Sequence, residues 1–175
     1  MSHAPIERAS PWVLRWADLV DRGPLLDVAS GAGRHSILFA ERGLEVVAVD
    51  RDPQSIPGVR FVHADLESGG PWPFEGQRFA AIVVTNYLHR ALFPRIESSL
   101  EEGGVLIYET FMVGNERYGR PSNPAFLLKP GELLAAFGGL TPIAFEQGYV
   151  ESPKPAMIQR LCARRGAITG ARIAL

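Results

Sequence analysis

Short apolar runs alternate with amphipathic helical segments along the first two-thirds of the chain. Strands are predicted at residues 25–29, 44–49, 59–64, 79–85 and 105–111, because each is a short aliphatic run bounded by turn-forming residues. Helices are predicted between several of them, where apolar residues recur three or four positions apart. This alternation predicts a parallel α/β sheet with right-handed crossovers and helices on both faces.

The predicted helices carry recognisable start and stop signals. Ser10 followed by Pro11 is a typical helix start, and Gly23-Pro24 ends that helix. A second helix runs from Arg34 to Arg42. A third is marked by Leu92, Phe93, Ile96 and Leu100 and is closed by Gly103-Gly104. Residues 52–57 and 67–77 are predicted to be short turns or loops, because they are rich in Gly, Pro and polar residues.

The last third of the chain follows another pattern. A polar loop at 112–129 precedes a short helix at 130–137 and two strands at 140–150 and 156–164. The link between these strands is short and contains two prolines, so we expect the pair to be antiparallel. The fold class is therefore a Rossmann-like, seven-stranded, mostly parallel α/β sheet with a C-terminal antiparallel strand pair.

Length and composition narrow the function classes. The 175 residues predict one domain over 1–175, and 46% hydrophobic with 21% charged residues is an ordinary globular balance. The net charge of −1 argues against a nucleic-acid partner. No apolar run approaches the roughly 20 residues of a membrane span, and no secretion signal is evident. The single Cys162 fits a reducing compartment and a buried strand position, so we expect a cytoplasmic protein. The histidines and Cys162 form no metal-ligand pattern, and the oligomeric state is left open.

Polar residues gather where the predicted parallel strands end. Asp27 to Gly33 form a glycine-containing strand-to-helix turn, in which Gly31 and Gly33 allow a ligand to approach the backbone. Asp50 ends the next strand, at the place where a carboxylate meets ribose hydroxyls. Asp65 ends the third strand and could accept a hydrogen bond from an adenine amino group, beside Leu66. Taken singly, each could be an ordinary turn residue, but three such strand ends point to one adenosine ligand.

These motifs resemble the class I S-adenosylmethionine-dependent methyltransferases, and the resemblance extends from Leu25 to Arg164. It departs at Ala29, where the family usually has glycine. The segments Gly33-Arg34-His35-Ser36 and Phe126 to Leu133 are similar to small stand-alone bacterial methyltransferases, including the tellurite-resistance type. The resemblance implies S-adenosylmethionine as cofactor, held by Asp27, Ala29, Ser30, Gly31, Gly33, Arg34, Asp50, Arg51, Ala64, Asp65, Leu66 and Asn86.

The acceptor side is predicted less sharply. Tyr87 and His89 follow the fourth strand and are candidates for a general base, with a pocket wall and a solvated helix start as their plainer interpretations. Segment 1–22 is expected to place a helix over the site, and segment 112–138 a loop and short helix over the acceptor side. The candidate acceptor contacts are Trp12, Arg15, His35, Glu109, Arg117 and Tyr118, with Thr110 and Phe111 beside Glu109. A basic loop of this kind could recognise an anionic acceptor, or it could simply be solvated.

The sequence thus predicts methyl transfer to a small-molecule acceptor, and two alternatives remain open. A nicotinamide-dependent oxidoreductase shares the glycine turn and Asp50, but Ser36 stands where the dinucleotide fingerprint has its third glycine. A non-catalytic domain that binds S-adenosylmethionine would keep the same binding residues. No Asn-Pro-Pro-Tyr or Asp-Pro-Pro-Tyr follows the fourth strand, which disfavours the enzymes that methylate the amino groups of bases and glutamine.

Overall fold

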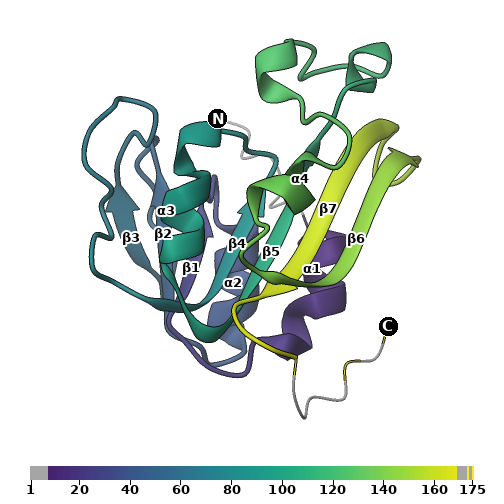
Figure 1. The fold of residues 1–175 in the computed structure, drawn as a ribbon. Helices are drawn as coiled ribbons and strands as arrows, with labels where there is room; N and C mark the ends of the chain where they lie inside the picture. The colour runs from purple at the N-terminus through teal and green to yellow at the C-terminus, as the bar shows by residue number, and fades with distance from the viewer. Residues whose placement is uncertain (1–7, 169–172, 174) are drawn as a thin grey trace.

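The computed structural model describes residues 8–168, 173 and 175, and a seven-stranded sheet forms its centre (Figure 1). The strands are β1 (Leu25–Val28), β2 (Val46–Asp50), β3 (Arg60–His63), β4 (Phe79–Thr85), β5 (Leu100–Phe111), β6 (Thr141–Val150) and β7 (Ala156–Arg164). Their order across the sheet is β3-β2-β1-β4-β5-β7-β6. The first five strands are parallel, and β7 is antiparallel to both β5 and β6. The predicted fold class is confirmed.

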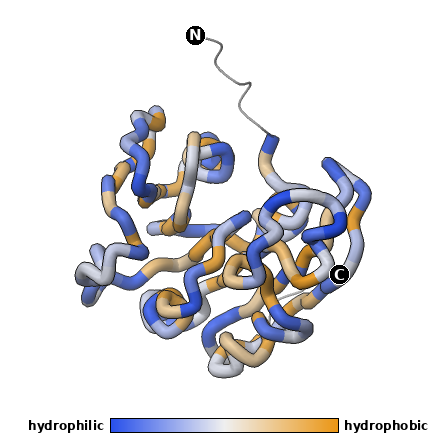
Figure 2. The backbone as a smooth tube through the Cα atoms, turned by 90° about the horizontal axis from the view of Figure 1, so that it is seen from above, coloured by the Kyte–Doolittle hydropathy of each residue, from blue (hydrophilic) through white to orange (hydrophobic). Residues whose placement is uncertain are grey.

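Helices cover both faces of the sheet, as predicted. The helices are α1 (Pro11–Trp16), α2 (Arg34–Glu41), α3 (Phe93–Ser98) and α4 (Glu132–Ala136). In Figure 1, α3 and α4 lie in front of the sheet and α1 and α2 behind it. Successive side chains of a strand point to opposite faces, so Ile82 and Val84 join the core on the α3 side and Ala81 and Val83 the core on the α1 side. Seen from above, hydrophobic positions run through the middle of the molecule (Figure 2).

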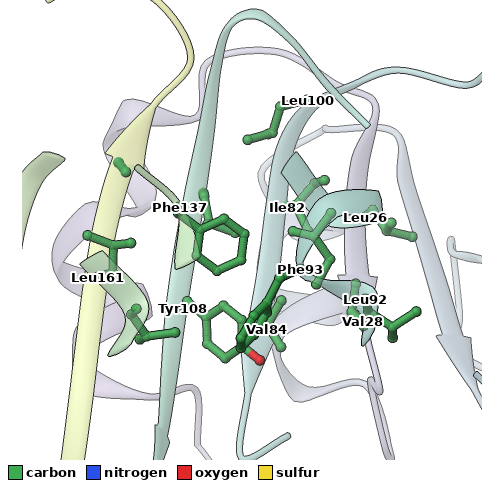
Figure 3. Close-up of a cluster of buried hydrophobic side chains, with 14 of the residues drawn as sticks. Leu26, Val28, Ile82, Val84, Leu92, Phe93, Leu100, Tyr108, Phe137 and Leu161 are labelled. Carbon is green, nitrogen blue, oxygen red and sulfur yellow. The ribbon is translucent and has the colours of Figure 1, made fainter. Parts of the chain in front are cut away.

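Three aromatic rings bind α3 and α4 to the front face of the sheet (Figure 3). The Phe93 and Phe137 ring centroids are 5.2 Å apart, and the Tyr108 centroid lies 5.9 Å from that of Phe137. Tyr108 donates its hydroxyl proton to the carbonyl oxygen of Tyr87 at 2.8 Å. This bond fixes the backbone just after β4, which is one of the strand ends that form the site.

One predicted element is wrong. Leu100 does not end the third helix, because α3 stops at Ser98 and Leu100 begins β5 as the register partner of Phe79. The pairing shifts register before Ala81 meets Val105, so Gly103-Gly104 lie inside β5 instead of after a helix. A side chain at Gly104 would place its Cβ 2.9 Å from the carbonyl oxygen of Glu101. The glycines therefore serve a strand irregularity, which the sequence pattern does not separate from a helix end.

The N-terminal helix is shorter than predicted, and residues 1–7 of the predicted segment lie outside the described residues. Ser10 is its N-cap, as expected, and its Oγ accepts a hydrogen bond from the Trp12 amide at 3.1 Å. Helix α1 continues into a 3₁₀ turn at Ala17–Leu19. Its buried Trp12 and Trp16 pack on the back face of the sheet, with rings in edge-to-face contact. Cys162 is buried in β7, as predicted.

Candidate active site

A cavity of about 480 Å³ lies at the carboxyl ends of the parallel strands. It is lined by residues at the ends of β2 and β5, by residues that follow β1, β2, β3 and β4, and by two residues of the segment that projects beyond β5 (Figure 1). The lining consists of Ala29, Gly31, Asp50, Arg51, Asp52, Ala64, Asp65, Leu66, Glu67, Asn86, Tyr87, Leu88, Thr110, Phe111, Pro121 and Phe126. Ligand sites of doubly wound sheets occur at this edge, so the strand-end prediction and the cavity coincide.

The turn after β1 is bonded directly to the end of β2. The Gly31 amide donates to Asp50 Oδ2 at 2.8 Å, and the Asp52 amide donates to Asp50 Oδ1 at 2.9 Å. Gly31 has a φ of +54°, and a Cβ there would meet nothing within 4 Å. Ala29 also has a positive φ, of 52°. This conformation favours glycine, which is the physical meaning of the family's usual glycine at that position.

Beneath this turn lie buried polar groups. Asp27 is 1% exposed, and its Oδ2 accepts a hydrogen bond from Ser36 Oγ at 2.6 Å. Burial raises the pKa of Asp27 to about 6, although the bonds from Ser36 oppose the shift. The hydroxyl of Ser30 is also buried and has no hydrogen-bond partner among the described residues. A buried unpaired hydroxyl is costly, but neither Ser30 nor Asp27 belongs to the cavity lining, so both predicted cofactor contacts lie behind it.

Gly33 and Arg34 begin helix α2 beside the cavity without lining it. Gly33 is the N-cap with a φ of +83°, and a Cβ there would lie 2.5 Å from Ile56 Cδ1. Arg34 Nη1 donates to the carbonyl oxygen of Arg8 at 3.2 Å. Gly33 therefore allows the loop after β2 to close over the start of α2, and Arg34 holds the segment before α1.

The end of β3 supplies the wall next to β2. The Ala64 amide donates to the Asp50 carbonyl oxygen at 3.0 Å, which ties this wall to β2. Asp65 Oδ1 accepts from the Glu67 amide at 2.9 Å. Burial, together with the neighbouring Glu67 carboxylate, raises the pKa of the Tyr87 phenol. Tyr87 is thus a neutral phenol, and its raised pKa speaks against the general-base alternative.

Asn86 and His89 take different positions after β4. Asn86 lines the cavity and has a φ of 53°, and its backbone N–H donates to the Glu109 carbonyl oxygen at 2.9 Å. His89 is half-buried at the start of a 3₁₀ turn, Arg90–Leu92, and is not part of the cavity lining. The structure does not bring the second candidate base to the cavity.

Several predicted acceptor residues instead join a polar network between α1 and the strand ends. The Ser10 amide donates to His35 Nε2 at 3.0 Å, and Ser10 Oγ donates to Glu109 Oε1 at 2.7 Å. Burial lowers the pKa of His35 to about 3, so His35 is neutral and Nδ1 carries the proton toward Thr85 Oγ1, 3.4 Å away. Glu109 also pairs with Arg160 of β7. His35 and Glu109 therefore anchor the start of α1 and do not line the cavity.

The remaining predicted acceptor contacts lie elsewhere. Trp12 is 2% exposed and packs in the back core. Arg15 pairs with Glu146 of β6 at 2.9 Å, on the surface. Arg117 is exposed, and the Tyr118 ring lies 5.1 Å from that of Tyr149. None of these four residues belongs to the cavity lining.

Five lining residues were not among the sequence candidates: Asp52, Glu67, Leu88, Pro121 and Phe126. A signal existed for the two acids, since each stands two residues after a strand-end aspartate. Pro121 and Phe126 lie in the predicted acceptor-side segment, but nothing in their spacing distinguishes them from their neighbours. Within the described residues there is no cluster of three His, Cys, Asp or Glu side chains that could hold a metal ion. No helix in that part of the chain is long and apolar enough to cross a bilayer.

The sequence of this chain is similar to a family model and to curated proteins. Residues 26–107 match the family model described as a methyltransferase domain. The protein YqeM of Bacillus subtilis (strain 168), whose name describes a methyltransferase, is 31% identical over 62% of this chain and 50% of its own. Ribosomal RNA small subunit methyltransferase H of Gemmatimonas aurantiaca is 27% identical over 84% of this chain and 48% of its own. The chain thus spans about half the length of these curated relatives.

Solved structures share the fold at low identity. TehB from Haemophilus influenzae aligns with a TM-score of 0.72 and 14% identity, over 88% of this chain and 61% of that one. The 1,6-didemethyltoxoflavin-N1-methyltransferase of Burkholderia thailandensis aligns with a TM-score of 0.62 and 22% identity, over 89% and 76%. That structure contains its acceptor and S-adenosylhomocysteine. The likeness to TehB shows a shared fold.

Proposed function

We propose that this chain is a class I S-adenosylmethionine-dependent methyltransferase that transfers a methyl group from S-adenosylmethionine to a small-molecule acceptor; the match to a methyltransferase domain over residues 26–107 and the shared fold support this. The observation that carries the proposal is the hydrogen bond that joins the glycine turn to Asp50, with Asp65 in the lining of the same cavity at the strand ends. A relative acts on ribosomal RNA by its name, but the net charge of −1 and the acidic lining of this cavity support a small acceptor.

The residues present fit the cofactor. Asp50 uses each carboxylate oxygen once for a backbone amide, and a carboxylate has about four acceptor positions, so two remain for ribose hydroxyls. Gly31 leaves open space where a side chain would stand. Next to Asp50 in the cavity lining, Asp65 and Leu66 suit the amino edge and the face of adenine.

The chemistry requires little of the protein beyond positioning. The cofactor would supply an activated methyl group. A lone pair of the acceptor forms the new bond to this methyl group while the S–CH₃ bond breaks. The electrons of the broken bond stay on sulfur, and S-adenosylhomocysteine is the product. The chain's residues hold the reactants in line and exclude water, for which Tyr87, Leu88 and Phe111 supply the nearest walls. An acceptor that arrives with a free lone pair needs no base, and the raised pKa of Tyr87 is consistent with that.

The oxidoreductase alternative is weakened by Ser36. In a dinucleotide fingerprint the third glycine lets the helix pack closely on the strand. Here the residue is a serine whose hydroxyl is bonded to Asp27 in the core of the turn. A polar side chain with a defined role at that position supports the methyltransferase pattern. The buried Cys162 supports a reducing compartment such as the cytoplasm.

Calorimetry with S-adenosylmethionine, S-adenosylhomocysteine and NADH tests the cofactor. The two sulfur ligands are expected to bind and NADH is not, and binding of NADH alone would overturn the proposal. Transfer of labelled methyl groups to a panel of small acceptors then tests catalysis. Tight binding of S-adenosylhomocysteine with no transfer to any acceptor would favour the non-catalytic binding domain.

A further inference from the structure

The cavity has an apolar, aromatic wall on the side away from Asp50 and Asp65. Leu88 follows β4, Phe111 ends β5, and Pro121 and Phe126 come from the segment beyond β5. Phe126 is 46% exposed although it lines a cavity. Covering a large exposed apolar side chain is favourable in free energy, because it removes apolar surface from water. A ligand with a flat apolar surface would therefore bind favourably against the Phe126 ring.

Phe126 is held in place by Arg90. The guanidinium donates from Nη1 to the carbonyl oxygen of Ala125 and from Nη2 to that of Leu127, both at 2.9 Å. The same group forms a two-pronged ion pair with Glu132, at 2.5 and 3.0 Å. The carbonyls on either side of Phe126 are therefore fixed to a residue that follows β4. The side chain of Phe126 is presented by an ordered turn, Pro124–Phe126.

Pro121 is held in a similar way by Asn115. This side chain is 2% exposed, and its Nδ2 donates to the Pro121 carbonyl oxygen at 3.0 Å. Its Oδ1 accepts from the Met157 amide of β7 at 3.1 Å. Pro121 and Phe126 are thus both positioned by hydrogen bonds that tie the segment to the sheet or to the turn after β4.

The charges around the cavity exclude one class of acceptor. Four carboxylates line it, from Asp50, Asp52, Asp65 and Glu67, against a single cation among its lining residues, Arg51. The cationic side chains of the segment, Arg117, Arg120 and Lys129, are exposed and are not part of the lining. An anion would meet repulsion there without a compensating partner. The hypothesis of an anionic acceptor bound by the basic loop therefore finds no support in the placement of these residues.

We propose that the acceptor is a planar, ring-bearing small molecule without negative charge, that Phe126 determines this specificity, and that Arg90 positions Phe126. This inference rests on the proposed function, because it assumes that the cofactor occupies the part of the cavity around Asp50 and Asp65. Cationic acceptors gain further from the acidic lining and from the faces of Phe111 and Phe126.

Binding of three indole probes to the protein saturated with S-adenosylhomocysteine tests the charge rule. The probes are 3-methylindole, tryptamine and indole-3-propionate, which share a ring and differ in the charge of the side chain. Saturation-transfer NMR is expected to show binding of the neutral and cationic probes, with the anionic probe weaker by about tenfold or more. Equal or tighter binding of indole-3-propionate, or binding of none of the three, would overturn the inference.

Matched variants test the two residues. Phe126→Ala is expected to weaken tryptamine binding by about three- to tenfold, while Phe126→Tyr retains it. Arg90→Lys keeps the charge but loses the fork geometry, so it is expected to weaken tryptamine binding without changing the affinity for S-adenosylhomocysteine. Arg120→Ala removes an exposed cation of the same segment and is expected to change neither affinity. Unchanged tryptamine binding in Phe126→Ala would refute the assignment.

The same experiment separates this inference from the proposed function. Failure of S-adenosylhomocysteine to bind the wild-type protein would remove the methyltransferase proposal itself. Normal binding of S-adenosylhomocysteine with the wrong order of indole probes would remove the acceptor inference alone.

Discussion

The amide of Gly31 donates a hydrogen bond to Asp50 Oδ2 over 2.8 Å, and this bond joins two strand ends that are 19 residues apart in the chain. It means that Asp50 has two functions. One oxygen orients the glycine turn, while the lone pairs that remain on both oxygens face the cavity. Under the proposed function, the shape of the turn and the recognition of a ribose would therefore depend on the same carboxylate.

Replacing Asp50 is expected to weaken S-adenosylhomocysteine binding. Asp50→Ala removes both the ribose acceptors and the partner of Gly31, at a cost of about 1–3 kcal/mol of binding free energy. Asp50→Asn keeps one acceptor oxygen and the shape of the side chain, so its loss should be smaller. Calorimetric titration of both variants measures the difference. An Asp50→Ala protein with wild-type affinity would show that the ligand does not contact this residue.

The stability of the protein should depend on pH through two buried groups of opposite sign. The pKa of Asp27 is raised to about 6, so its contribution to stability is full below about pH 4 and is lost as the pH rises through 6. The pKa of His35 is lowered to about 3, so its contribution is present above about pH 6.5 and is lost as the pH falls. Between pH 6.5 and 4 the two effects oppose each other.

Two variants separate these effects. Asp27→Asn removes the group that gains stability on acidification, so the free energy of unfolding should fall more steeply than in the wild type, by on the order of 2 kcal/mol over this range. His35→Gln removes the opposing group, and the fall should be shallower. Urea unfolding at pH 4.5 and 6.5 gives both slopes. Parallel pH profiles for all three proteins would mean that neither group titrates as described.

A Gly33→Ala variant should lose more stability than Gly43→Ala. Both glycines have a φ near +80°, so alanine at either site costs roughly 1–2 kcal/mol of conformational strain. At Gly43 the added Cβ meets nothing within 4 Å, whereas at Gly33 it lies 2.5 Å from Ile56 Cδ1. The difference between the two midpoints in urea reports the contact alone. Adding Ile56→Val to Gly33→Ala should recover part of it, and equal losses at both sites would contradict this close packing.

The Glu109–Arg160 pair should be among the more important ion pairs for stability. Its side chains are 11% and 15% exposed, and Glu109→Ala would leave the guanidinium with Glu146 alone, at a cost of roughly 3 kcal/mol. The Arg95–Glu75 pair is 52% and 73% exposed, so Glu75→Ala should cost less than about 1 kcal/mol. Thermal unfolding of the two variants compares them. A similar loss in both would show that burial does not set the strength of these pairs.

Part of the cavity lining was predictable from the sequence, because these residues lie at the strand ends or directly after them. Asp50 ends β2, and Asp65 follows two residues after the end of β3 at His63, so both lie at the carboxyl edge of the sheet. The period of the apolar runs is enough to locate such ends. The sheet topology was predictable for a similar reason. Alternating strands and helices, followed by a short proline-containing link between the last two strands, are compatible with few topologies.

The lining residues of the segment beyond β5 were not predictable from the sequence. Long-range contacts place them, and such contacts leave no periodic pattern of apolar residues. Phe126 reaches the cavity because Arg90, 36 positions earlier, holds the carbonyls beside it. His35 and Glu109 looked like acceptor contacts at strand ends or helix starts, but their partners are Ser10 and Arg160. The pattern predicts the strand at 105–111 but assigns Leu100 to the preceding helix, because a register shift interrupts the pairing at the start of β5.

Arg90 fixes the turn at Pro124–Phe126 through hydrogen bonds to main-chain oxygens, not to the side chains of the turn. These bonds therefore do not depend on which side chains occupy positions 125 and 126. Substitutions there can exchange one ring, alkyl group or charge for another while the turn keeps its path and the adenosine side stays untouched. Under the proposed function, the residues that contact the acceptor can therefore change during evolution while the residues that bind the cofactor stay the same.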